Sequence, residues 1–86
     1  MLFSNAIAQT VTLSGYVRDA KTGEELVGAT VQLKEIAKGV ATNASGFYSI
    51  TAEPGTYTVV VRIIGYNELQ QKISLTSNLT KNFLLE

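Results

Sequence analysis

Hydrophobic and polar residues alternate along most of the chain, and the most apolar, β-branched part runs from Gly55 to Tyr66. Val, Ile, Thr and Tyr favour the pleated, half-buried surface of a sheet. We therefore predict a long central strand here. Two apolar residues, Val60 and Ile64, fall on its otherwise polar face, which predicts that a partner or an adjacent domain of the same protein covers this face. The expected inward face, at period two, comprises Tyr57, Val59, Val61 and Ile63.

The same period of two predicts six further short strands. Turn-forming residues such as Gly23, Gly46 and Pro54 separate them, because these residues adopt or fix backbone angles that turns need. No helical periodicity is sustained, and residues 24–27 or 34–38 can form one turn of helix at most. We therefore predict an all-β protein, a seven-stranded antiparallel Greek-key β-sandwich. The six further strands cover residues 10–19, 29–34, 39–42, 47–51, 69–75 and 79–85, with Lys81 interrupting the alternation of the last.

The residues before the first strand differ in character from the rest. Ala6-Ile7-Ala8 fits the small-x-small pattern that signal peptidase recognises, with cleavage before Gln9. The basic and most of the apolar parts of a signal peptide are missing, so residues 1–9 are either a signal-peptide remnant or a disordered leader. We expect residues 10–86 to form the folded domain and expect the protein to be exported.

Composition narrows the chemistry that the sandwich can perform. The 86 residues contain no cysteine and no histidine, so disulfides, thiolate nucleophiles and the Ser-His-Asp arrangement are excluded. The seven carboxylates lie in turns or at strand ends, where they are normally solvated. The turn at residues 43–46 offers oxygen ligands but lacks the carboxylates of a calcium loop. We expect a protein that is not an enzyme and that has no catalytic residue, metal site or cofactor.

Charge and hydrophobicity exclude two classes of partner. Seven basic and seven acidic residues cancel, so the chain lacks the excess of positive charge that nucleic-acid binding requires. No apolar run approaches the roughly 18 residues of a membrane-spanning helix. We therefore expect no nucleic-acid partner and no direct insertion of this domain into a membrane.

Residues on nominally outward positions are candidates for an interaction surface. Apolar residues there can form a docking patch for another protein, and an edge strand can pair with a partner strand. Exposed aromatic rings can instead stack against sugars, although core packing or isolated surface aromatics are the more common case. The candidate surface comprises Val60, Ile64, Phe47, Leu84, Tyr16 and Tyr66.

Two motifs involving asparagine have simpler interpretations. An isopeptide bond between Asn82 and one of Lys34, Lys38 or Lys81 requires a buried lysine, and only Lys81 falls on an inward position. Asn78-Leu79-Thr80 matches the glycan-acceptor pattern, which is frequent by chance. We assign no function to either motif.

Three stretches of the chain, in order and with the right spacing, resemble the carboxypeptidase regulatory-like domain. Residues 15–31 are similar to its G-x-V-x-D…G-x-P-L-x-G-A-x-V opening, and residues 39–50 to its G-x-x-T-D-x-x-G-x-F-x-I middle. Residues 55–66 resemble its G-x-Y-x-L-x-V-x-x-x-G-Y signature. The chain departs from this pattern at Glu25, where proline is usual, at Asn43 instead of aspartate, and at Tyr48 instead of phenylalanine.

The resemblance implies a transthyretin-like (prealbumin-like) sandwich that serves as a non-catalytic appendage. In the glycan-importing type of TonB-dependent outer-membrane receptor, this domain follows the signal peptide and lies in the periplasm. We accordingly expect a structural or protein-interaction module of such a receptor, in contact with adjacent receptor domains or a periplasmic partner. The alternatives are a carbohydrate-binding module, with weak binding, or a regulatory or folding appendage of a secreted metallocarboxypeptidase.

Overall fold

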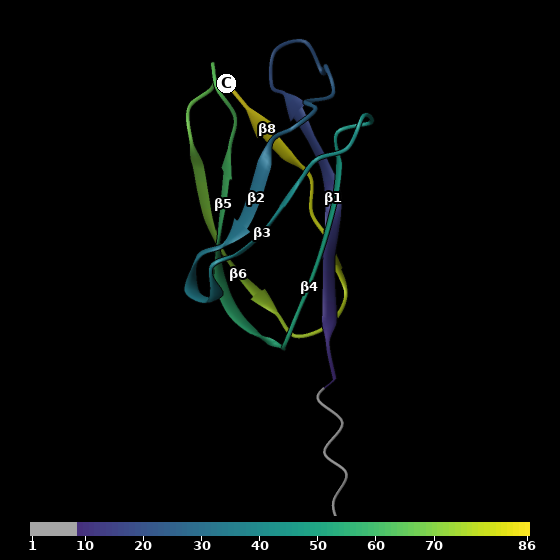
Figure 1. The fold of residues 1–86 in the computed structure, drawn as a ribbon, viewed down its shortest axis with the longest axis vertical. Coiled ribbons are helices and arrows are strands. Elements are labelled where there is room, and N and C mark those ends of the chain that lie inside the picture. Colours follow the sequence, from purple (N-terminus) through teal and green to yellow (C-terminus); the bar gives the residue numbers. More distant parts are fainter. Residues whose placement is uncertain (1–8) are drawn as a thin grey trace, which may run out of the picture.

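The computed structural model describes residues 9–86, and in it two sheets pack face to face as a sandwich (Figure 1). The signal-peptide prediction for residues 1–8 lies outside the described residues. One sheet has the strand order β4-β1-β7, with β8 also paired to β1. Its strands are β1 (Val11–Asp19), β4 (Phe47–Ala52), β7 (Leu79–Thr80) and β8 (Phe83–Leu85).

The second sheet has the order β3-β2-β5-β6, and β5 is one of its two central strands. A short 3-10 turn, η1 (Lys34–Ile36), follows β2, which agrees with the expected limit of one helical turn at residues 34–38. Strands distant in sequence are thus neighbours in both sheets, and the expected all-β sandwich is confirmed. The strands of this sheet are β2 (Thr30–Leu33), β3 (Lys38–Ala41), β5 (Gly55–Arg62) and β6 (Leu69–Leu75).

The core lies between the sheets and consists of the residues that alternation placed inward. In β1 every second residue is buried, from Val11 to Val17, and in β5 the same holds for Tyr57, Val59 and Val61. Each such residue removes apolar surface from water, which is the main force favouring the fold. The rest of the core cluster comprises Leu13, Leu26, Ala29, Val31, Leu33, Tyr48, Ile50, Ala52, Ile73, Leu75, Phe83 and Leu85.

The last predicted strand is wrong in two respects. It is split into β7 and β8, and both pieces run parallel to β1, so the first sheet is mixed and not purely antiparallel. The split occurs at Lys81–Asn82, where the Asn82 side chain takes over part of the pairing: its Oδ1 accepts the Tyr16 N–H at 2.9 Å. The backbone approaches β1 so closely here that a Cβ on Gly15 would lie 2.0 Å from the Lys81 carbonyl oxygen.

The predicted central strand is shorter than expected. β5 ends at Arg62, and the chain then turns through Ile63–Gly65, with the Tyr66 N–H donating to the Ile63 carbonyl at 3.2 Å. Gly65 has φ of 94°, a value that residues with a Cβ rarely adopt. The apolar run therefore continues past the sheet and supplies residues to one end of the sandwich.

The two ends of the described chain lie at opposite ends of the sandwich (Figure 1). Glu86 is beside the loop between β5 and β6, where its carbonyl accepts the Asn67 N–H at 2.8 Å. Any polypeptide that continues beyond Glu86 therefore leaves the domain next to the loop that contains Ile64 and Tyr66. We call this the Glu86 end.

Candidate functional site: an apolar hollow at the Glu86 end

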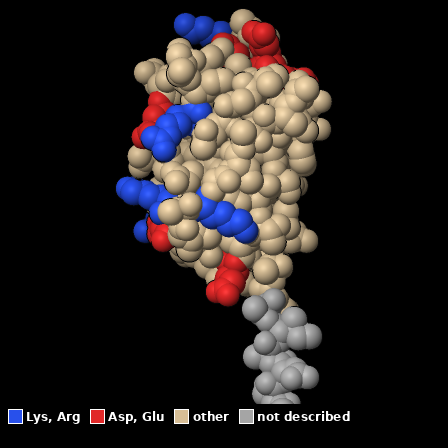
Figure 2. All heavy atoms as spheres, viewed as in Figure 1, with Lys and Arg blue, Asp and Glu red and all other residues tan. Residues whose placement is uncertain are grey.

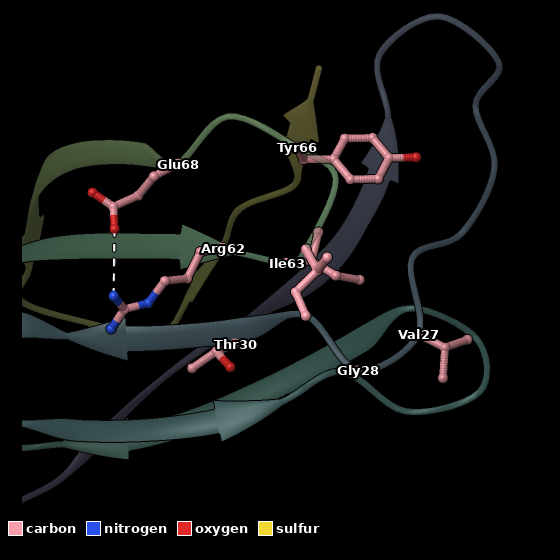
Figure 3. Close-up of a pocket in the computed structure, with 8 residues that line it drawn as sticks. Val27, Gly28, Thr30, Arg62, Ile63, Tyr66 and Glu68 are labelled. Carbon is pink, nitrogen blue, oxygen red and sulfur yellow. Dashed lines mark ion pairs between the residues drawn. The ribbon is translucent and has the colours of Figure 1, made fainter.

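A hollow of about 630 Å³ lies at the Glu86 end, between the β5–β6 loop and the segment that leads into β2. Figure 3 shows Tyr66 and Val27 on opposite sides of it, with the end of β5 between them. Gly28 has φ of 78°, and its N–H donates to the Thr42 carbonyl at 3.1 Å, which fixes the segment that carries Val27. The hollow is lined by Val27, Gly28, Thr30, Arg62, Ile63, Ile64, Tyr66 and Glu68.

The apolar side chains of the hollow are unusually accessible. Ile64 is 99% exposed and Val27 is 57% exposed, whereas Ile63 packs partly against the core. Large aliphatic side chains in this state gain free energy when another surface removes them from water, at about 25 cal/mol per Å² of apolar area. Their proximity in one hollow suits them to contact with another protein.

Polar contacts hold the rim of the hollow. Arg62 and Glu68 form an ion pair with a nitrogen–oxygen distance of 3.5 Å, drawn in Figure 3. On the other side, the Tyr66 hydroxyl donates to Asp19 Oδ2 at 2.7 Å and so ties the β5–β6 loop to the end of β1. The Asp19 carboxylate also accepts the N–H groups of Thr22 and Lys21.

These hydrogen bonds change the titration of both partners at the rim. Donation from Tyr66, followed by the N–H groups of Thr22 and Lys21, lowers the pKa of Asp19 from 3.8 to about 2. The same hydrogen bond to the Asp19 carboxylate is the main reason why the pKa of the Tyr66 hydroxyl is raised. Both shifts stabilise an ionised Asp19 with a neutral Tyr66, which is a structural contact and not a pair poised for proton transfer near neutral pH.

Acidic side chains are sparse at the hollow. Within residues 9–86 no group of three or more Asp and Glu residues is close enough to hold a metal ion. The one carboxylate that lines the hollow, Glu68, is paired with Arg62. What remains is an apolar surface with a charged margin, which is suited to binding another molecule.

The six predicted surface residues divide into three groups. Ile64 and Tyr66 lie together at the hollow. Tyr16, Phe47 and Leu84 lie on the outer face of the first sheet, because Tyr16 pairs with Phe47 across β1 and β4, and Arg18 pairs with Leu84. Val60 is alone on the outer face of the second sheet.

The aromatic residues on the first sheet form a packed cluster. The rings of Tyr16 and Phe47 meet edge to face with centroids 5.3 Å apart, and the Arg18 guanidinium lies 4.7 Å from the centre of the Tyr16 ring. One face of Tyr16 is therefore occupied by a cation, which is itself a stabilising contact. Leu84 is 56% exposed beside this cluster.

Val60 is buried within the domain itself, so it is not accessible as the candidate interaction surface requires. It is 5% exposed, although it faces away from the core. Its register partners are Gln32 and Gln70, and hydrogen bonds from Arg62 to Gln32 and from Gln70 to Glu68 join these side chains around it. Long polar side chains of its own sheet thus take the place of the partner that the sequence suggested.

The isopeptide and glycan motifs have structural roles. The Lys38 ammonium donates to the carbonyl of Thr51, and the Asn82 side chain accepts from the Tyr16 backbone. Asn78 accepts the Thr12 N–H at 2.9 Å, so both asparagines help to attach the C-terminal strands to β1. In the turn at 43–46, the Asn43 side chain accepts the N–H groups of Ser45 and Phe47, as in an ordinary turn.

The sequence did not identify Val27, Arg62 or Glu68 as site residues. Val27 is an apolar residue directly before a glycine in a loop, and this is a signal that could have marked it as exposed. The pairing of Arg62 with Glu68 depends on how β5 and β6 meet, which the sequence does not specify. In the view of Figure 2, charged side chains gather along one side and at the two ends of the domain, and they form no continuous basic surface on this face.

Comparison with known proteins identifies the fold's relatives. The profile of the CarboxypepD_reg-like domain matches residues 13–86, from the middle of β1 to the last residue. The chain belongs to the carboxypeptidase regulatory-like domain family. The motifs that carried this resemblance, together with the two-sheet architecture, are thereby confirmed.

Individual relatives of the domain are parts of much longer proteins. The chain is 34% identical to the TonB-dependent receptor SusC of Bacteroides thetaiotaomicron over 74 residues, which is 86% of this chain and 7% of that protein. It is 33% identical to human carboxypeptidase D over 73% of the chain and 5% of that protein. Bacillopeptidase F of Bacillus subtilis is 35% identical over 87% of the chain and 5% of that protein.

A solved structure also shares the fold. A chain of a type II cohesin–X–dockerin complex from Acetivibrio cellulolyticus superposes with a TM-score of 0.78. The match covers 87% of this chain and 56% of that chain at 21% identity, so it concerns the fold alone. No helix among residues 9–86 has the length and apolar character needed to cross a membrane.

Proposed function

We propose that this chain is a non-catalytic protein-interaction domain of an exported protein, the periplasmic N-terminal domain of a TonB-linked outer-membrane receptor that takes up glycans or other nutrients. The similarity to SusC over 86% of the chain supports this setting. The observation that carries the interaction role is the accessible apolar hollow at the Glu86 end, whose one lining carboxylate is already paired with Arg62.

In this proposal the hollow receives the adjacent receptor domain or a periplasmic partner. The position of Glu86 favours the adjacent domain, because the chain that follows it starts within a hydrogen bond of the β5–β6 loop. A domain tethered there reaches the hollow at a high effective concentration, so modest contacts are sufficient to hold it. The ion pair of Arg62 and Glu68 then forms part of a polar rim around Ile64 and Val27.

Two measurements test the proposal. The coding sequence beyond Glu86 is expected to continue into a TonB box and a plug, and a stop codon or a peptidase domain there would contradict the receptor setting. Hydrogen exchange compared between this domain alone and the full-length protein is expected to show added protection at residues 63–68. Unchanged exchange at these residues would contradict docking at the hollow.

A second setting is a regulatory or folding appendage of a secreted metallocarboxypeptidase. The similarity to human carboxypeptidase D over 73% of the chain favours it. The same coding sequence separates the two settings, because this one requires a peptidase domain in the same polypeptide. Carbohydrate binding, which Tyr16, Phe47 and Tyr66 suggested, is the weakest candidate because Arg18 covers one face of the Tyr16 ring and Tyr66 is bonded to Asp19.

A further inference from the structure

The four edges of the two sheets differ in how well they are protected. Unpaired backbone groups on an edge invite pairing with another chain, and proteins usually shorten, interrupt or charge their edges to prevent it. On the β4 edge of the first sheet, the Thr51 carbonyl already accepts a hydrogen bond from the Lys38 ammonium. The opposite edge of the same sheet is interrupted between β7 and β8. In the second sheet β3 has four residues, whereas β6 has seven.

β6 is a regular strand along its whole length. Its register with β5 is continuous from Leu69 to Leu75, without a bulge. The strand contains no proline, and its one charged residue is Lys72. Within residues 9–86, β5 is the only strand paired with it. The other edge of β6 therefore has the features that favour addition of a strand.

The hydrogen bonds of β5 establish which groups of β6 face the open edge. The Thr58 N–H donates to Glu35 Oε1 at 2.7 Å, and Glu35 lies just beyond β2, so Thr58 directs its backbone groups toward β2. Thr58 and Lys72 are register partners and hence form a non-hydrogen-bonded pair. By alternation, the N–H and C=O groups of Gln70, Lys72 and Ser74 point out of the sheet edge.

A groove adjoins this edge on the side of the first sheet. It has a volume of about 370 Å³ and runs between the start of β6 and the end of β8. Leu84, which is 56% exposed, and Leu85 line it from β8, and Leu69 and Gln70 line it from β6. The polar residues Asn67, Glu68 and Glu86 complete its lining at the end nearest the hollow. A strand added to β6 would direct every second side chain toward this groove, where Leu69, Leu84 and Leu85 are the apolar contacts.

Lys72 determines which kind of strand fits. If a second copy of β6 paired antiparallel with this one over its full length, Lys72 would lie opposite Lys72 of the other copy, and like charges directly opposite are destabilising. No acidic side chain of residues 9–86 is within 4.0 Å of its ammonium group. A foreign strand with a carboxylate at this position would form a favourable cross-strand pair instead.

We propose that the open edge of β6 binds an extended segment of a partner protein, with an Asp or Glu opposite Lys72 and apolar residues on either side of it directed toward the Leu84–Leu85 groove. The inference rests on the proposed function in treating the domain as an interaction module, but it concerns the open edge of β6, whose groove shares only Glu68 with the hollow. Backbone hydrogen bonds to Gln70, Lys72 and Ser74 supply affinity, and the carboxylate and apolar residues supply specificity.

The experiment uses the isotopically labelled 86-residue chain and short peptides that alternate valine and threonine, with glutamate, glutamine or lysine at the centre. Hydrogen exchange followed by NMR is expected to show new protection of the Gln70, Lys72 and Ser74 amides on peptide addition. The amides of Gln71 and Ile73 are already bonded to β5 and should change little. The glutamate peptide should bind about fivefold more tightly than the lysine peptide.

Two variants separate the backbone contribution from the charge. Lys72→Pro removes an amide that β5 does not use, so the sheet should persist while the peptide-induced protection is lost. Lys72→Thr is the matched control that keeps the amide, and it should bind all three peptides with similar affinity. If Lys72→Pro fails to fold, Lys72→Glu provides an independent test, since it should reverse the preference in favour of the lysine peptide.

Protection of the three alternate amides with the predicted charge preference supports the proposal. Absence of protection with every peptide at millimolar concentration overturns it, as does protection confined to the hollow. Protection of the same amides without peptide, in a chain that sediments as a dimer, also overturns it and assigns the edge to a second copy. The test of the hollow remains distinguishable, because residues 63–66, whose exchange it compares in the full-length protein, do not line the groove.

Discussion

The interior between the sheets and the hollow at the Glu86 end are both lined with aliphatic and tyrosine side chains, but the most exposed side chains of the hollow have no counterpart in the interior. Leu33 in the interior is 0% exposed, whereas Ile64 in the hollow is 99% exposed. Leu33 lies in β2, and Ile64 lies in the turn directly after the neighbouring strand β5. Residue type alone therefore does not tell whether an apolar side chain serves the fold or a partner.

The difference arises from where each residue lies relative to the ends of the sheets. Between the sheets, two layers of side chains cover one another, and within residues 9–86 no buried side-chain polar atom lacks a hydrogen-bond partner. β5 ends at Arg62, and Ile64 lies in the turn that follows, where its side chain is exposed. Substitutions in the interior should thus alter stability, and substitutions in the hollow should alter contacts while leaving stability nearly unchanged.

The largest effect is expected at Gly15, which lies in β1 where the backbone of Lys81 approaches. Gly15→Ala would place a Cβ 2.0 Å from the Lys81 carbonyl oxygen, so the two chain segments must separate. We expect a loss of about 4 kcal/mol or more in the free energy of unfolding, which is most of the stability of a typical small domain. Urea denaturation followed by circular dichroism measures it.

Gly39→Ala is the matched control for this substitution. Gly39 lies in β3, and a Cβ there would come no closer than 3.4 Å to another atom. Its stability should change by about 0.5 kcal/mol or less. Equal losses in the two variants would contradict the explanation from close approach.

The requirement for glycine at position 15 shows which parts of the fold the sequence could not specify. Alternation placed Gly15 inward correctly, because the period of a strand is a local property. The approach of Lys81 depends on β1 pairing with a segment 66 positions away, with both pieces parallel to it. Local patterns contain no information on such pairing, so the split strand and its parallel direction were missed.

The candidate site was predictable to a smaller extent than the fold. Ile64 and Tyr66 were identified because an apolar residue on a polar face and an aromatic residue at a strand end are visible in sequence. Val60 had the same signal, but hydrogen bonds between Gln32, Arg62 and their neighbours enclose it. Whether a polar neighbour covers an apolar residue depends on the conformations of both side chains. The pattern of apolar and polar positions does not specify these conformations.

The next largest effect is expected from truncation within the core. Leu33→Ala should lower the free energy of unfolding by about 3 kcal/mol, because the side chain is fully buried and the cavity cannot close completely. Ile64→Ala removes an aliphatic side chain of similar size and should change it by less than about 0.5 kcal/mol. Parallel urea titrations measure both. Similar losses would show that the hollow is part of the core.

A smaller effect is expected where the two regions are hardest to tell apart, on the outer face of β5 and in the turn that follows it. Val60→Thr introduces a hydroxyl into a buried position and should cost about 1 kcal/mol. Ile64→Thr should be neutral in this chain and should weaken docking in the full-length protein. Melting temperatures of the two variants, with exchange at residues 63–68 in the full-length form, separate these roles. If Val60→Thr leaves the melting temperature unchanged, the polar side chains that cover Val60 must move aside easily.

The smallest effect is expected at the rim of the hollow, where a hydrogen bond fixes the loop. Because the pKa of Asp19 is lowered from 3.8 to about 2, its ionisation favours the folded state above pH 3.8, and this contribution is lost as the pH falls toward 2. Tyr66→Phe removes the largest cause of the lowered pKa, so the carboxyl should titrate at higher pH and the loss of stability in acid should be smaller. NMR titration of the Asp19 side-chain carbon measures the change in its pKa, and urea titration at several pH values measures the loss of stability in acid.

Tyr16→Phe is the control, because Asp19 accepts no hydrogen bond from Tyr16, and it should leave the titration unchanged. An unaltered Asp19 titration in Tyr66→Phe would mean that the backbone N–H groups of Lys21 and Thr22 alone lower the pKa of the carboxyl. The Tyr66 hydroxyl would then not fix this side of the hollow.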